Sequence, residues 1–339
     1  MSSVLRLWLV AVAAAFGLAA CGSSPATKHA SPPSATTRPA PSTTSSASRP
    51  TAPAPPATTA PAPPATTTSG TGPERPCGTA SSPPARYQHV VWIWMENHTW
   101  GSVIGNSAAP YITGLAHQCG TDANYSAVGS PSLPNYLGAT SGSTQGVTDD
   151  GDPGEHSFVA DNLFRQVRRA GGTERSFAES MPGNCGLVSE DSYAAKHNPA
   201  AYFDGPGDRA ACQADDVPFS DFPAVLASGD LPTYTSITPN ICDDMHDCSV
   251  AVGDRWLATW VPRILATTSY RSGTTALFIV WDEPTPLANV VVAPCVRPGT
   301  VTNVAVDHYS LLRATEEMLG LPLLGAAASA TSLRAASGV

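Results

Sequence analysis

The stretch HVVWIWM, residues 89–95, consists almost wholly of branched and aromatic residues. Such a run is typical of a parallel strand that is buried on both faces of a sheet. Residues 276–281 and 289–293 form two further apolar runs of this kind, and residues 233–237 also predict a strand. Apolar residues at helical spacing predict helices over 108–118, 158–170, 254–267 and 309–319. Strands that alternate with helices indicate an α/β fold, with a mainly parallel central sheet flanked by helices.

Composition divides the chain into two parts. Sixteen of its 33 prolines lie between Pro25 and Pro84, in a stretch of Pro, Ala, Thr and Ser with too little apolar surface to offset the entropy of folding. Residues 85–339 hold 13 basic and 26 acidic residues. A domain this acidic is a poor candidate for nucleic-acid binding, which depends on Lys and Arg. No long apolar run follows the N-terminus, which excludes a polytopic membrane protein.

The N-terminus resembles an export signal. Residues 7–20 form an apolar run of the length of a signal-peptide core, which is short for a membrane span. The run ends in LAAC, residues 18–21, which resembles a bacterial lipobox; the alternative is an ordinary signal peptide that happens to contain a cysteine. We expect a lipoprotein signal peptide over residues 1–21. A lipid on Cys21 would anchor the exported protein to the outer face of a membrane.

The same division gives the expected domain bounds. Residues 22–84 are expected to be a disordered linker that acts as a semi-extended stalk. Residues 85–325 are expected to form the folded domain, and residues 326–339 a C-terminal tail.

Seven cysteines remain when Cys21 is set aside. Disulfides persist in exported proteins, so we expect these cysteines to pair, although spacing alone does not fix the connectivity. The expected pairs are Cys242–Cys248, Cys185–Cys212 and Cys77–Cys119, and one cysteine must stay unpaired. The absence of a CxxC pair argues against a metal–thiolate site.

Polar residues follow the predicted strands at their carboxyl ends. Glu96 and Asn97 follow the first strand, and Asp282 and Glu283 follow the strand at 276–281. The acidic loop 240–247 follows the strand at 233–237. Catalytic groups of parallel sheets collect at this edge, and carboxylate, amide and imidazole groups that converge there predict a divalent metal site. Taken singly, each of these residues is more often a helix cap or a turn residue; their conjunction carries the prediction.

Five segments in order resemble motifs of the phosphoesterase family, which contains bacterial phospholipases C and metal-dependent acid phosphatases. They are VVWIWMENHTW (90–100), SPSLPNYL (130–137), PNICDDMHD (239–247), the acid pair at 282–283, and HYSLLR (308–313). The resemblance covers about residues 88–322. It implies an alkaline-phosphatase-like fold and makes residues 85–325 a phosphoesterase catalytic domain. One departure is the short segment 284–288, since relatives usually carry a longer Gly-rich loop there.

The resemblance also implies roles for single residues. Ser132 matches the family's nucleophile, which would attack phosphorus and form a phosphoserine. The matching metal ligands, for one or two divalent ions, are Glu96, Asn97, Ser132, Asp244, Asp282 and Glu283. His246 and His308 are expected to bind phosphate and act as acid and base, because a histidine with an ordinary pKa is protonated in acid solution. Asn135 either bonds a phosphoryl oxygen or caps the turn.

These expectations favour an exported, metal-dependent acid phosphatase that hydrolyses phosphomonoesters. The first alternative is a phospholipase C that acts on phosphodiester head groups and shares the same catalytic residues. The second is an inactive surface lipoprotein that binds ligands. The expected partners are therefore a small phosphate ester or a phospholipid head group, together with the membrane. His89, His117, His156 and His197 match no motif and are expected to be surface or structural residues.

Overall fold

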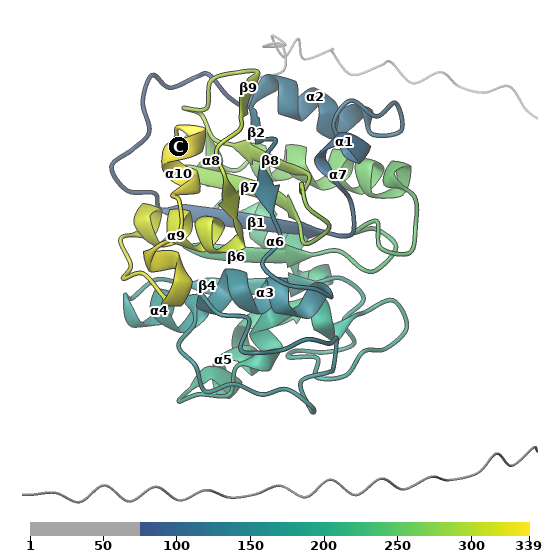
Figure 1. The fold of residues 1–339 in the computed structure, drawn as a ribbon. Helices are drawn as coiled ribbons and strands as arrows, with labels where there is room; N and C mark the ends of the chain where they lie inside the picture. Colours follow the sequence, from purple (N-terminus) through teal and green to yellow (C-terminus); the bar gives the residue numbers. More distant parts are fainter. Residues whose placement is uncertain (1–74) are drawn as a thin grey trace, which may run out of the picture. The chain divides into compact units, whose positions relative to one another are not determined.

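The stretch that predicted the fold forms β1 (His89–Met95), at the centre of an eight-stranded sheet (Figure 1). The structure is a computed structural model and describes residues 75–339, so Cys21 and most of the expected linker lie outside the described residues. The strands follow the order β5-β4-β6-β1-β7-β8-β2-β9. β1 pairs in parallel with β6 and with β7, while β8 runs antiparallel to both β7 and β2. The sheet is thus mainly parallel, as predicted.

The remaining strands are short. Those of the main sheet are β2 (Gly120–Asp122), β4 (Glu174–Ala178), β5 (Asp216–Pro218), β6 (Tyr234–Thr238), β7 (Thr275–Trp281), β8 (Asn289–Val292) and β9 (Thr300–Thr302). A separate parallel pair is formed by β3 (Tyr125–Ser126) and β10 (Val306–Asp307).

Helices flank this sheet. They are α1 (Trp100–Val103), α2 (Pro110–Gln118), α3 (Ser132–Ser141), α4 (Leu163–Arg169), α5 (Asp208–Asp215), α6 (Phe222–Ser228), α7 (Val250–Leu265), α8 (Thr268–Arg271), α9 (His308–Leu319) and α10 (Leu333–Ser337). No helix among residues 75–339 is both long and apolar enough to cross a lipid bilayer.

Alternate side chains of β1 meet the helices that carry the site. Trp92 Nε1 donates to Thr315 Oγ1 of α9 at 3.1 Å, and the Trp94 ring lies 4.5 Å from the ring of Tyr136 in α3. Because side chains two apart on a strand point to the same face, α3 and α9 cover one face of β1. α2 and α7 form another packed pair, in which Asp254 accepts the backbone N–H of Ile112 at 2.8 Å.

Several predicted bounds differ from the structure by a few residues; α7, for example, begins at Val250 instead of residue 254. Two further differences have a clear physical reason. The helix predicted over 158–170 begins only at Leu163, because Asn162 caps it by accepting the backbone N–H of Arg165. The packed unit is also larger than the expected domain of residues 85–325. Cys77 is fully buried before it, and Leu333 and Val339 are buried after it. The expected tail therefore contributes to the core.

All three expected disulfides are present: Cys77–Cys119, Cys185–Cys212 and Cys242–Cys248. Cys295 is the unpaired cysteine of the described residues. Cys185, Cys212 and Asp216 bring possible ligand atoms within 4.8 Å of one another. This group is not a metal site, because sulfurs joined in a disulfide offer no thiolate.

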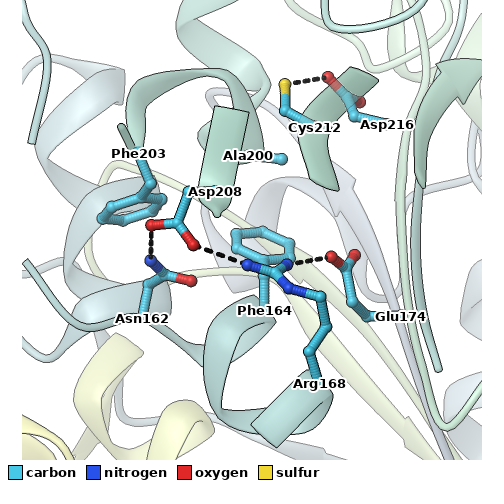
Figure 2. A pocket seen from close by; sticks show the side chains of 9 residues that line it. All are labelled: Asn162, Phe164, Arg168, Glu174, Ala200, Phe203, Asp208, Cys212 and Asp216. Atoms are coloured by element: carbon cyan, nitrogen blue, oxygen red, sulfur yellow. Dashed lines mark hydrogen bonds and ion pairs between the residues drawn. The ribbon is translucent and has the colours of Figure 1, made fainter. Parts of the chain in front are cut away.

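A buried network of charged and amide side chains joins α4, β4 and α5 around a small cavity (Figure 2). Asp208 accepts hydrogen bonds from Asn162 Nδ2 at 3.1 Å and from Arg168 Nη2 at 2.6 Å. Arg168 also contacts Glu174 Oε1 at 2.5 Å. Opposite charges therefore face one another in this network, as burial requires, and they fix the placement of the three elements.

Asp216 lines the same cavity and makes the fold sensitive to pH. Burial raises the pKa of Asp216 to about 8, against the lowering effect of a hydrogen bond from Asn198. The folded chain therefore keeps a proton that the unfolded chain releases near pH 4. Stability from this group is present below about pH 4 and is lost as the pH rises toward 8. We expect Asp216→Asn to shrink the loss of unfolding free energy between pH 5 and pH 8 by on the order of 2 kcal/mol.

Urea unfolding at the two pH values measures this effect. The exposed Asp191→Asn is the matched control and should keep the wild-type dependence. An Asp216→Asn protein with the wild-type difference between pH 5 and pH 8 would contradict the assignment.

Candidate active site

Three buried carboxylates converge at the carboxyl edge of the sheet. Glu96 directly follows β1, Asp282 directly follows β7, and Asp244 lies in the loop after β6. All three side chains are fully buried. The backbone holds them in place: Glu96 N donates to Asp244 O at 2.8 Å, and Asp282 N donates to Met95 O at 3.1 Å. The parallel pairing of β6, β1 and β7 thus brings together acids that are far apart in the sequence.

Helix α3 begins at the predicted nucleophile and supports the first of these acids. Ser132 Oγ donates to Glu96 Oε2 at 3.1 Å. Tyr136, one helical turn later, donates its hydroxyl to Glu96 Oε1. One carboxylate oxygen of Glu96 therefore accepts a hydrogen bond from the serine, and the other accepts one from the tyrosine. Together these bonds hold the carboxylate beside the serine hydroxyl.

His197 completes the cluster, although no motif marked it. Its Nε2 lies 3.4 Å from Glu96 Oε1 and its Nδ1 lies 3.2 Å from Asp244 Oδ2. The imidazole stacks on the ring of Tyr136 with centroids 5.5 Å apart. Burial lowers the pKa of His197 to about 3, so its nitrogens are not both protonated near neutral pH. The expected surface or structural histidine is thus a central residue of the site.

The cluster has the properties of a cation site. Burial, followed by the charges of Asp282 and Asp244, raises the pKa of Glu96 well above its ordinary value, and burial raises that of Asp244 to about 8. Four buried polar atoms have no hydrogen-bond partner: both ring nitrogens of His197, Asp244 Oδ2 and Asp282 Oδ2. Possible ligand atoms of Glu96, His197 and His246 all lie within 4.8 Å of one another. Such a donor set fits a divalent ion.

A charged rim borders this cluster. His246 Nδ1 lies 2.7 Å from Asp247 Oδ1, and its Nε2 lies 3.4 Å from Lys196 Nζ. Lys196 Nζ also donates to Asp150 Oδ2 at 2.8 Å. Burial alone would lower the pKa of Lys196, but its hydrogen bond and ion pair with Asp150 raise it above the ordinary value. Lys196 is therefore a cation at the edge of the site.

Two predicted catalytic residues, His308 and Asn135, use their side chains to hold the protein backbone. His308 is fully buried; its Nε2 lies 2.8 Å from the backbone oxygen of Asp282 and its Nδ1 lies 3.3 Å from Tyr125 OH. Burial lowers the pKa of His308 to about 4. This geometry fits a residue that positions Asp282 better than one that reaches a substrate.

The Asn135 side chain hydrogen-bonds to the backbone of the loop that precedes Ser132. Its Oδ1 accepts the backbone N–H groups of Val128 and Gly129, both at 2.9 Å. Its Nδ2 donates to the backbone oxygens of Gly129 at 3.1 Å and Pro131 at 3.3 Å. Of the two roles that the sequence left open, these contacts correspond to shaping the turn before Ser132.

Two predicted ligands stand apart from the buried cluster. The Asn97 side chain is exposed, and the residue adopts a left-handed φ of 58°, from which its backbone N–H donates to Asp282 Oδ1 at 3.0 Å. Glu283 is half-buried; burial raises its pKa, and a hydrogen bond with Ser130 partly offsets the rise. The structure thus brings Glu96, Ser132, Asp244 and Asp282 together, and it adds His197.

Comparisons with known proteins agree with this geometry. The profile of the Phosphoesterase family matches residues 106–285. The chain is 34% identical over 266 residues to a phosphatidylinositol-3-phosphatase of Mycobacterium tuberculosis, which covers 75% of this chain and 84% of that protein. It is 28% identical over 257 residues to an acid phosphatase of Aspergillus fumigatus, covering 70% of this chain but only 56% of the fungal protein.

The fold has solved counterparts as well. A protein of the alkaline phosphatase superfamily from Vibrio parahaemolyticus superposes with a TM-score of 0.50 at 11% identity, over 77% of this chain and 74% of that one. This likeness confirms the predicted fold class. Together, the profile match and the mycobacterial relative show that the chain belongs to the Phosphoesterase family and is a hydrolase that acts on phosphoric ester bonds.

Proposed function

We propose that this protein is an exported, metal-dependent acid phosphatase that hydrolyses phosphomonoesters through a phosphoserine at Ser132. The observation that carries the proposal is the position of Ser132 Oγ, 3.1 Å from Glu96 Oε2 and beside a cluster in which four buried polar atoms make no hydrogen bond. A serine at the first turn of a helix, next to a cation site, has the arrangement that activates a hydroxyl for attack on phosphorus.

The residues that would hold the metal are Glu96, Asp244, Asp282 and His197, with Ser132 as the reacting ligand. A bound divalent ion supplies positive charge, which lowers the pKa of the serine hydroxyl and offsets charge on the phosphoryl group. The donor set is supported by four buried atoms that make no hydrogen bond, namely Oδ2 of Asp244, Oδ2 of Asp282 and the two ring nitrogens of His197.

The protein residues then carry out a two-step transfer. Ser132 Oγ forms a bond to phosphorus as the bond to the leaving alcohol breaks. The hydroxyl proton, which Ser132 donates to Glu96 Oε2 in the structure, leaves the serine, and the alcohol oxygen takes up one proton from solvent, so the number of protons is unchanged. Water next attacks the phosphoserine and releases phosphate and Ser132. The proton that this water loses returns to Ser132 Oγ as the bond to phosphorus breaks. His246, whose Nδ1 faces Asp247 and whose Nε2 faces Lys196 Nζ at 3.4 Å, orders the rim of the site beside that water. His308 supports Asp282 from behind and transfers no proton to the substrate.

The natural substrate we favour is a phosphomonoester on a lipid. The mycobacterial relative is named for phosphatidylinositol 3-phosphate, and the fungal relatives are named as acid phosphatases. A lipid anchor at Cys21 would keep the enzyme beside such a substrate. Three disulfides support export, because they persist in oxidising compartments.

Parallel assays of the purified protein on p-nitrophenyl phosphate and p-nitrophenyl phosphorylcholine test the proposal. We expect release from the monoester, a loss of about 100-fold or more with a chelator, and recovery when a divalent ion is restored. Release from the choline diester alone would favour the phospholipase C alternative. Activity that survives complete metal removal would refute the metal requirement, and no release from folded, metal-loaded protein would favour the ligand-binding alternative.

A further inference from the structure

Lys196 is one of two lysines in the chain, the other being Lys28, and it has no part in the chemistry described above. Its Nζ lies 2.8 Å from Asp150 Oδ2 and 3.4 Å from His246 Nε2. The Lys196 side chain is 19% exposed, so it lies half-buried at the rim of the site. A desolvated cation beside a phosphoryl-transfer site calls for a functional explanation.

Two paths of contacts connect Lys196 with the nucleophile. On one side, the second oxygen of Asp150 accepts the backbone N–H of Leu133, the residue after Ser132, at 3.0 Å. On the other side, a ring nitrogen of His246 lies within 4.8 Å of a carboxylate oxygen of Glu96, which holds Ser132. The ammonium group is therefore linked through Asp150 to the segment that carries Ser132, and through His246 to the carboxylate that accepts the Ser132 hydroxyl.

The ammonium group has one donor to spare. It carries three N–H donors and no acceptor. Asp150 takes one and His246 takes another, since an ammonium group can only donate to the imidazole. Within residues 75–339, no third acceptor contacts Nζ. A ligand oxygen is thus the natural partner of the third N–H.

We propose that Lys196 binds the phosphoryl oxygen that is free in a phosphomonoester and esterified in a phosphodiester, and thereby selects monoesters. The inference rests on the proposed function and names its specificity residue. A monoester carries a charge of about −1.5 to −2 and three free phosphoryl oxygens. A diester carries one charge less and has a carbon on one of those oxygens. A bound diester would leave the third N–H of the half-buried Lys196 ammonium without an acceptor. A site that donates a hydrogen bond to its ligand binds a ligand without the acceptor much more weakly.

The test uses the neutral variant Lys196→Met and the charge-retaining Lys196→Arg at pH 7, with p-nitrophenyl phosphate as substrate. Two competitive inhibitors are compared. Inorganic phosphate carries up to two negative charges at this pH, as a monoester does, whereas dimethyl phosphate is a diester with one. We expect Lys196→Met to lower kcat/KM by about 10- to 100-fold and to raise the inhibition constant of phosphate by about tenfold or more. The constant of dimethyl phosphate should change far less, and Lys196→Arg should recover part of the loss. Arg297→Met, an exposed cation outside the site, is the matched control.

The double variant Asp150→Asn, Lys196→Met separates this role from a structural one. If Lys196 only neutralises Asp150, removing both charges restores hydrolysis and phosphate inhibition, and the inference is overturned. If Lys196 binds substrate, the double variant stays impaired. Equal losses for phosphate and dimethyl phosphate would also overturn it. Ser132→Ala keeps the two proposals apart: full turnover in that variant refutes the proposed function, whereas an inactive Ser132→Ala with unchanged phosphate inhibition in Lys196→Met refutes only this inference.

Discussion

Replacing Ser132 with alanine should lower kcat for p-nitrophenyl phosphate by about 10,000-fold or more. The variant loses the oxygen that forms the bond to phosphorus, and within residues 75–339 no second hydroxyl donates to Glu96 Oε2. Folding should be nearly unchanged, because Tyr136 still donates to Glu96 and α3 keeps its other contacts. Steady-state kinetics and thermal unfolding measure the two effects.

The matched control for this variant is Ser157→Ala. Ser157 is exposed and lies outside the cluster, so turnover should stay at the wild-type level. Trapping of a labelled phosphoryl group on the wild-type protein, followed by peptide mapping, should place the label on Ser132. Full activity in Ser132→Ala, or a label on another residue, would remove Ser132 from the role of nucleophile.

Replacing His197 with alanine should lower kcat by about 100-fold or more and reduce the amount of divalent metal that copurifies. The His197 imidazole lies between the Glu96 and Asp244 carboxylates, at 3.4 and 3.2 Å. In the alanine variant, Glu96 and Asp244 lose their contacts with the imidazole, and the proposed metal ion loses a nitrogen ligand. Metal content by mass spectrometry and kinetics on the same samples check the result.

His117→Ala is the matched control, because His117 is an exposed residue on α2. A second variant, His197→Gln, keeps a polar side chain in the cavity and guards against a loss of folding in the alanine protein. If either folded His197 variant retains wild-type metal content and turnover, His197 is a structural residue and the proposed ligand set is wrong.

The main strands could be predicted because their sequences are nearly continuous apolar runs. β1 and β7 are buried along almost their whole length, and the pattern has no other simple explanation. β4 was not predicted, because it begins with the charged residues Glu174 and Arg175 and so lacks a continuous apolar run. Glu174 is buried beside Arg168 of α4, six residues earlier in the chain, and nothing in the spacing of these two charged residues indicates a buried ion pair.

The site residues likewise divide into those that a local sequence pattern marks and those that only the tertiary fold brings to the site. Glu96 and Asp282 could be predicted because an acid directly after a buried parallel strand must lie at the carboxyl edge. His197 and Lys196 lie in a 3-10 helix of three residues with no periodic pattern around it. Only the tertiary fold brings that segment against Glu96. Likewise, the sequence showed that Asn135 lies one turn from Ser132, but only the four hydrogen bonds showed where its side chain is used.

The direction of β1 separates the N-terminal connection from the catalytic edge. The chain enters the packed unit at the buried Cys77, and Thr79 N donates to Pro294 O at 2.8 Å, just past the end of β8 and therefore beside the start of the antiparallel β7 and of β1. Arg334 of α10 binds the backbone oxygen of Pro84 at 2.9 Å. Glu96 lies at the other end of this seven-residue strand, which is about 23 Å long. The point where the chain enters the packed unit and the catalytic carboxylates thus lie at opposite ends of β1. A substrate therefore reaches Glu96 from the edge of the sheet that is remote from the N-terminal connection.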